Sequence, residues 1–372
     1  MKLPCITILA TLLLTAPAAA QLQITPPAAT PSPSAEKAKG NEKGNEKEKE
    51  KPKAAPHTIT KKKEATPAPK PSASPKPAAT PAPAATVIPA PPADDSNVDL
   101  VFGAYQRGQY KTAFDLATAR AKTGDVKAMT MLGELYSNAM GIRRDYAKAL
   151  EWYKRAADAG DREAMFALAM LRMSGRGGPV DKGEAVKLMA SAAKLGEPKA
   201  AYNLALLYLD GQTLPQDVKR SAELLRQAAD AGLPEAQYAL ATFYKEGTGV
   251  PKDAERSVRL LQAASLADNV DAEVEYAIAM FNGTGTPQNQ PAAVALLRKA
   301  SRQGSAIAQN RLAWVLINGM GTSVDKVEGF KWHLVAKTSG KGDPELDKQF
   351  SDLPAEDRAK AEAAARKWLG TK

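Results

Sequence analysis

Few residues of this chain have the types and spacing that chemistry requires. Histidine occurs only at His57 and His333, and cysteine only at Cys5. A zinc site needs about four Cys, His or carboxylate ligands, and their Cys and His members come at short, regular spacings. We therefore expect no metal site and no bound cofactor. A single cysteine also excludes a disulfide within the chain.

Two short strings match motifs of serine penicillin-recognising enzymes. Ser191, Ala192, Ala193 and Lys194 spell S-x-x-K, and Lys122, Thr123 and Gly124 spell K-T-G. Here K-T-G precedes S-x-x-K, the reverse of the order in those enzymes. We interpret both strings as chance overlap and expect no enzyme, with weak β-lactam hydrolysis as a distant alternative.

His333 is the one remaining residue that could act in acid–base chemistry. It follows Trp332 and has no second His or Cys near it, and the sequence offers no obvious acidic partner. We interpret it as a surface or packing residue. No glycine-rich phosphate loop of the strand–turn–helix type occurs.

A tandem repeat organises the chain from about residue 97 onward. One column of the repeat, with a step of 36 residues, contains Gly124, Gly160, Gly196, Gly232, Asp268, Gly304 and Gly340. A second column contains Ala128, Ala164, Ala200, Ala236, Ala272 and Ala308. A fixed period of this length is the signature of a repeat architecture, whose units bury their apolar faces by stacking.

Each repeat reads as two helices. In the first copy, Met129, Leu132 and Tyr136 have helical spacing, and Asp145 has the position of a helix N-cap. Loops such as GRGGPVD and GTGVPKD place Gly and Pro where helices must stop. The alanines and glycine of residues 156–169 fall where one repeat meets the next, so we interpret them as close-packing residues.

The pattern A-x3-LG-x-LY-x2-G-x-GV-x2-D-x2-KA-x2-WY-x2-AA-x2-G resembles the Sel-like repeat family, relatives of tetratricopeptide repeats. The resemblance covers residues 125–340 as six repeats, 125–160, 161–196, 197–232, 233–268, 269–304 and 305–340. It implies an all-α, α/α solenoid. Departures include Ala139 for the loop Gly, Asp268 for the terminal Gly and Gly329 for a small helix residue.

The two ends of the repeat region read as caps, and a different kind of sequence precedes it. We expect a capping helical hairpin at 97–124 and a capping helix at 341–372. Residues 1–20 have the charge, apolar run and small residues of a signal peptide cleaved after Ala20. Residues 21–96, rich in Pro, Ala, Lys and Glu, predict a disordered linker. We therefore expect a periplasmic or secreted protein without stable membrane insertion.

The chain's work is then expected to be binding. By resemblance to tetratricopeptide arrays, two variable columns of the first helices should face a groove. Their apolar members are Met170, Met173, Leu206, Leu209, Ile278, Phe281, Trp314 and Ile317. Tight packing that hides these residues is the structural alternative.

The expected partner is another protein. The family resemblance suggests a regulator of envelope signalling or exopolysaccharide production, and a cell-wall glycan or peptidoglycan binder is the alternative. The net charge of +10 is spread over the chain, with basic and acidic residues interleaved. We therefore expect no nucleic-acid binding.

Overall fold

The computed structural model describes residues 99–370, within which all regular structure is helical. The predicted signal peptide and linker, 1–20 and 21–96, lie outside the described residues. Among the described residues, no helix has both the length and the apolar character needed to cross a membrane.

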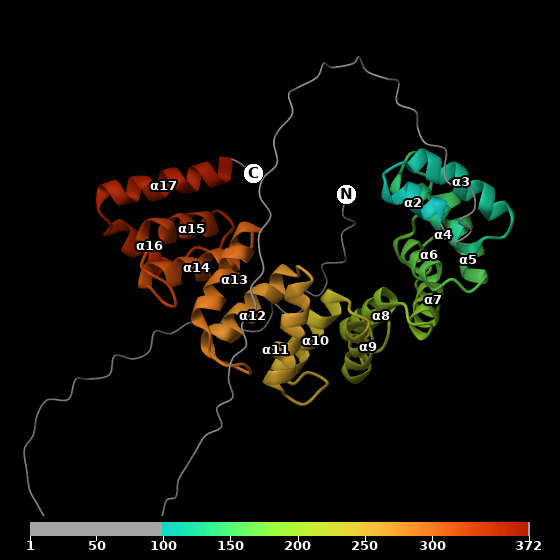
Figure 1. Cartoon of the computed structure of the whole chain (residues 1–372). Helices are drawn as coiled ribbons and strands as arrows, with labels where there is room; N and C mark the ends of the chain where they lie inside the picture. The colour runs from blue at the N-terminus through green and yellow to red at the C-terminus, as the bar shows by residue number, and fades with distance from the viewer. Residues whose placement is uncertain (1–98, 371–372) are drawn as a thin grey trace, which may run out of the picture. The chain divides into compact units, whose positions relative to one another are not determined.

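Six pairs of helices follow one another in chain order, as Figure 1 shows. The first helices of the pairs are α4 (Val126–Asn138), α6 (Arg162–Ser174), α8 (Pro198–Asp210), α10 (Pro234–Glu246), α12 (Val270–Asn282) and α14 (Ala306–Asn318). The second helices are α5 (Tyr146–Asp158), α7 (Lys182–Lys194), α9 (Val218–Asp230), α11 (Ala254–Leu266), α13 (Gln290–Arg302) and α15 (Lys326–Thr338). The expectation of an all-α solenoid is confirmed.

Helix starts and stops follow the chemistry of the repeat. The carboxylate of Asp145 accepts a hydrogen bond of 3.0 Å from the amide of Lys148, and an Asp or Asn caps each later second helix in the same way. At the other end of the first helices, glycines such as Gly175 take a left-handed conformation. In the first repeat Ala139 ends α4 in the same left-handed conformation, with a φ of 57°, although it has a Cβ.

Small residues form the joints between repeats. Ala156 on α5 and Ala164 on α6 are both 0% exposed and belong to one apolar cluster. The turn between them is made by Ala159 and Gly160, which are exposed. The helical alanines Ala156 and Ala164 are therefore close-packing residues as predicted, whereas Ala159 and Gly160 form the turn.

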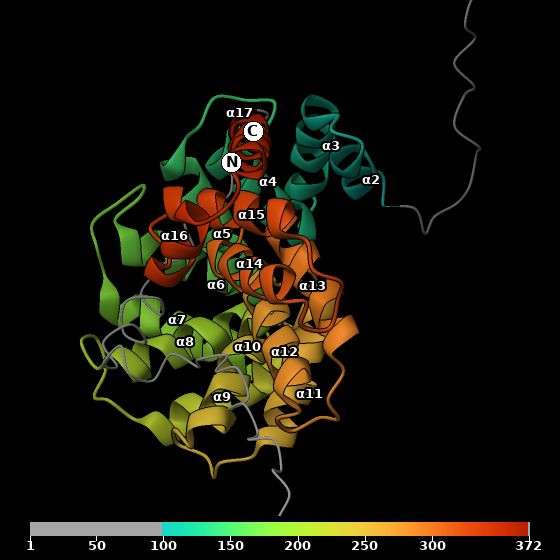
Figure 2. The same cartoon turned by 90° about the vertical axis from the view of Figure 1, so that its left-hand side faces the viewer.

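Helical elements cover both ends of the array. Helices α2 (Leu100–Gln106) and α3 (Tyr110–Lys122) precede the first repeat, and α3 packs against α4. The region 341–372, expected as one capping helix, contains two, α16 (Pro344–Ser351) and α17 (Ala355–Gly370). Helix α17 packs against α15 (Figure 2). The ring centroids of Trp332 and Trp368 lie 5.0 Å apart there.

Candidate functional site

The predicted binding columns separate into an accessible set and a buried set. Met170, Met173, Leu206, Leu209 and Trp314 are half-buried, so each offers part of its side chain to solvent. Ile278, Phe281 and Ile317 are 7%, 5% and 6% exposed and belong to the interior. For these last three residues the expectation of an exposed groove is corrected.

The burial of Ile317 has a local cause. A Cβ placed on Gly329 of α15 would lie 2.6 Å from Cγ1 of Ile317, so the two helices approach as closely as a glycine allows. Ile278 and Phe281 lie on α12, which buries eight of its residues, Ala272, Glu273, Val274, Ala277, Ile278, Ala279, Met280 and Phe281. Helices α6 and α8 each bury only four residues, which leaves their variable columns accessible.

Four accessible residues on α6 and α8, namely Met170, Met173, Leu206 and Leu209, form what we call the methionine–leucine surface. Met170 and Met173 pack on the buried group Ala169, Ala185 and Met189, together with Leu207 of the next repeat. Methionine is unbranched and polarisable, and surfaces that adapt to varied partners use it heavily. The four side chains are apolar and half-buried, and the two methionines among them are adaptable.

Trp314 is held in place by the end of the array. Its indole N–H donates a hydrogen bond of 2.9 Å to Oδ2 of Asp343, the N-cap of α16. Because its polar edge is already bonded, Trp314 offers a partner only the accessible part of its ring.

The first helices change character at repeats four and five. Lys245 on α10 forms an ion pair of 2.7 Å with Glu275 on α12. Burial, and then repulsion from Glu275, raises the pKa of Asp271. Burial also raises the pKa of Tyr238, and Glu275, Asp271 and Glu246 add to that shift. Carboxylates therefore crowd this part of the first-helix face, in contrast to the apolar α6 and α8.

Pairs of side chains from neighbouring repeats were not predicted from the sequence, although their separation of 29 or 30 residues is close to one repeat. Tyr105 donates to Glu134 over 29 residues, Lys245 pairs with Glu275 over 30, and Trp314 donates to Asp343 over 29. A search for complementary side chains about one repeat apart would have found all three.

The candidate enzymatic residues are not assembled into one site. Ser191 and Lys194 are exposed on α7, whereas Thr123 caps the end of α3 and donates to the carbonyl of Arg120. Among the described residues, no group of three or more His, Cys, Asp and Glu side chains is placed to hold a metal ion.

His333 differs from the expectation that it lacked an acidic partner. Its ring is 0% exposed, and its Nε2 lies 2.8 Å from Oδ1 of Asp347 on α16. Lys337 donates to the same oxygen at 2.7 Å. The His333 ring is buried, and its contact with Asp347 fastens α16 to α15, which is a structural role.

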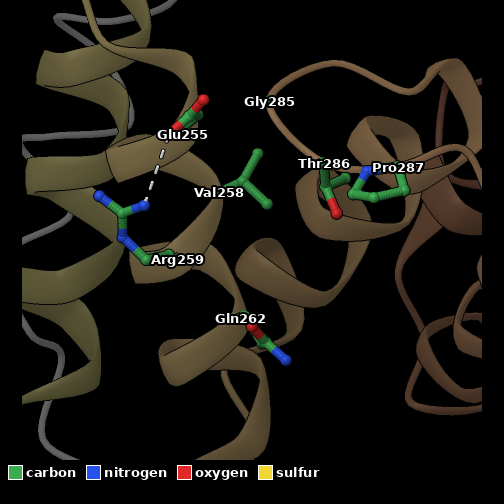
Figure 3. A pocket seen from close by; sticks show the side chains of 7 residues that line it. All are labelled: Glu255, Val258, Arg259, Gln262, Gly285, Thr286 and Pro287. Atoms are coloured by element: carbon green, nitrogen blue, oxygen red, sulfur yellow. Dashed lines mark ion pairs between the residues drawn. The ribbon is translucent and has the colours of Figure 1, made fainter.

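A shallow pocket of about 440 Å³ lies on a different surface, between α11 and the loop that follows α12 (Figure 3). Val258 and Pro287 give it an apolar side, and Glu255 forms an ion pair of 3.8 Å with Arg259 at its rim. Gln262, Gly285 and Thr286 complete the lining. None of the predicted binding residues contributes to this pocket.

Sugar recognition would need accessible aromatic rings side by side. Trp332 is 3% exposed and meets Trp368 edge to face in the C-terminal cap. Trp152 is half-buried beside Arg155, whose guanidinium lies 4.7 Å from its ring. The described tryptophans therefore form no exposed row.

A series of stacked two-helix units that presents the faces of its first helices defines an α-solenoid scaffold, the class of protein that binds partners along an extended surface. The Sel1 repeat model matches residues 126–161, 162–197, 198–233, 234–269, 270–305 and 306–340. This chain belongs to the Sel1 repeat family. The matched repeats begin one residue later than the boundaries expected from the sequence.

Two solved structures illustrate the relationship. The chain is 27% identical to a protective antigen of uropathogenic Escherichia coli with an SLR fold, with a TM-score of 0.62, and the match covers 73% of this chain and 59% of the antigen. A Sel1 repeat protein from Oxalobacter formigenes is 23% identical, with a TM-score of 0.55, over 63% of this chain and 94% of that protein. Among curated proteins, none matches the chain.

Proposed function

We propose that this protein is a non-enzymatic adaptor that binds another protein through the methionine–leucine surface of α6 and α8. One observation carries the proposal. Four large apolar side chains, Met170, Met173, Leu206 and Leu209, are only half-buried on neighbouring repeats, while their counterparts Phe281 and Ile317 are buried. Partly exposed apolar side chains that gather on one surface are typical of interaction sites.

The chemistry of this surface favours a protein segment that contributes apolar side chains. Methionine and leucine offer no charge and no strong hydrogen-bond donor, so affinity would come from the burial of apolar area. Export to the periplasm and a role in envelope signalling or exopolysaccharide production are part of the same proposal. They rest on the signal-like residues 1–20 and on the family resemblance.

The test is a crosslinked capture from envelope extract with the full chain as bait. The test variant is Met173→Gln with Leu206→Gln, which keeps the approximate size and removes the apolar character. Leu266→Gln is the matched control, because Leu266 lies on α11, outside the proposed surface, and is 81% exposed.

We expect one stoichiometric protein to be captured by the wild type and the control and lost from the double variant, with equal helicity by circular dichroism. Retention of that protein by the folded double variant would refute the surface assignment. If purified cell wall sediments the chain and no protein is captured, glycan binding replaces protein binding as the function.

A further inference from the structure

The loop between the two helices of a repeat closes over the preceding repeat. In five loops a glycine with positive φ lies against the first residue of the preceding second helix. The pairs are Gly141 with Tyr110, Gly177 with Tyr146, Gly249 with Val218, Gly285 with Ala254, and Gly321 with Gln290. A Cβ on Gly249, for example, would lie 2.7 Å from the carbonyl oxygen of Val218. Figure 3 shows Gly285 in its loop beside the start of α11.

At the joint between repeats two and three, no loop glycine meets the start of the preceding second helix. The equivalent residue is Thr213, and it is not among the described residues with positive φ. The start of α7, where the contact would fall, is exposed at Asp181, Lys182, Gly183 and Glu184. Of the five helix-start residues that meet a loop glycine, Tyr110, Tyr146, Val218 and Gln290 are half-buried and Ala254 is exposed.

A second, independent difference marks the same joint. Leu207 on α8 is half-buried, whereas the residues at its position in the other five repeats are buried, namely Leu135, Leu171, Phe243, Ala279 and Val315. The neighbouring apolar group contains Met170, Met173 and Met189. Long unbranched side chains can follow a moving surface better than branched ones.

The opposite edge of this joint is held firmly. Arg162 on α6 donates to the carbonyls of Leu195 and Gly196 at 3.2 Å and lies 3.7 Å from the carboxylate of Glu197. Gln227 on α9 donates to the carbonyl of Ala193 near the end of α7. A joint that is bonded at one edge and open at the other can rotate about the bonded edge.

We propose that the joint between repeats two and three is the hinge of the solenoid, with α6 and α7 moving against α8 and α9 about the bonds of Arg162 and Gln227. A helix of 13 residues is about 20 Å long, so a small rotation at the bonded edge moves the loop edge by several ångströms. If the proposed function holds, the hinge divides the methionine–leucine surface and sets the separation of its two halves.

The test needs no partner, so it can fail independently of the proposed function. In the full chain with Cys5→Ser, spin labels on Glu184→Cys and Gln212→Cys report on the open joint. Labels on Arg220→Cys and Thr248→Cys report on the equivalent joint between repeats three and four, where Gly249 meets Val218. The expected result is a distance distribution about twice as wide at the open joint, because no loop glycine holds the start of α7 there.

The substitution Thr213→Gly supplies the missing residue and should narrow the first distribution toward the second, while Gly249→Thr should widen the second. Hydrogen exchange on the unmodified chain gives an answer even if a variant does not fold. Amides of residues 185–189 should exchange about tenfold faster than those of 221–225. Equal widths or equal exchange at the two joints would overturn the hinge.

Discussion

The first repeat contains a glycine and a tyrosine that should depend on each other. A Cβ placed on Gly133 of α4 would lie 2.6 Å from Cδ1 of Tyr153 on α5, and Tyr153 is only 6% exposed. Repeats three, four and five have Ala and Leu at these two positions, for example Ala205 with Leu225. The pair Gly–Tyr fills the same space as the pair Ala–Leu, with the extra atoms on the other helix.

We expect Gly133→Ala alone to destabilise the first repeat. Overpacking a filled core costs about 1–3 kcal/mol. A helical alanine returns about 1 kcal/mol relative to glycine. The expected net loss is therefore about 1 kcal/mol. Tyr153→Leu alone leaves unfilled space and should lose about 1–3 kcal/mol.

The double variant Gly133→Ala with Tyr153→Leu recreates the arrangement of repeats three to five. It should fall within about 1 kcal/mol of the wild type, with a coupling free energy of about 1–2 kcal/mol. Stability differs along a repeat array, so the assay is native-state hydrogen exchange of α4 and α5 amides, with those of α12 as an internal reference. Additive single effects would refute the packing argument.

Three further predictions address backbone and charge. Gly249→Ala should lower the free energy of unfolding by about 2 kcal/mol or more, because the new Cβ meets the carbonyl of Val218 at positive φ. Gly232→Ala has open space around it and should lower the free energy of unfolding by about 1 kcal/mol. Urea unfolding of the two variants measures the difference. Ala139→Gly should stabilise the first repeat by about 0.5–1 kcal/mol, because relief of the left-handed strain exceeds the added unfolded-chain entropy, and unchanged hydrogen exchange in α4 would contradict it. The hydrogen bond from Lys337, and then that from His333, lowers the pKa of Asp347 below its ordinary 3.8. The ionised Asp347 therefore stabilises the folded C-terminal cap above pH 3.8, and this stabilisation is lost as pH falls through the lower folded-state pKa. Tryptophan fluorescence of the C-terminal cap should report that loss, and Lys337→Met should reduce it.

The fold could be predicted from the sequence because the residues that set it act locally. Asp145 caps α5 within three residues, and Gly175 ends α6 at the residue after its last turn. A 36-residue period then repeats these helix starts and ends in six consecutive repeats. The same reasoning predicted only one C-terminal capping helix, because Pro344 and Asp343, which start α16, lie outside the repeat pattern.

The accessible members of the candidate surface could be predicted only in part, because the exposure of a side chain depends on the neighbouring helix. Met173 and Ile317 occupy the same position of the repeat, and both are large and apolar. Ile317 is buried where Gly329 lets α15 approach its side chain. Phe281 is buried opposite Ala293, whereas Met173 is half-buried opposite Ala185. A column of residue types contains no information about that approach until the two helices are considered together.

The same reasoning explains why the candidate surface and the hinge coincide. Helices α12 and α14 bury Ile278, Phe281 and Ile317 of the variable columns, whereas Trp314 on α14 stays half-buried. At the joint where no loop glycine meets α7, Leu207, Met170 and Met173 are half-buried. The accessible apolar side chains and the proposed hinge therefore lie at the same joint, between repeats two and three. A partner that covers these side chains would restrict that motion, so binding should reduce the distance spread between labels at residues 184 and 212 and leave that between 220 and 248 unchanged.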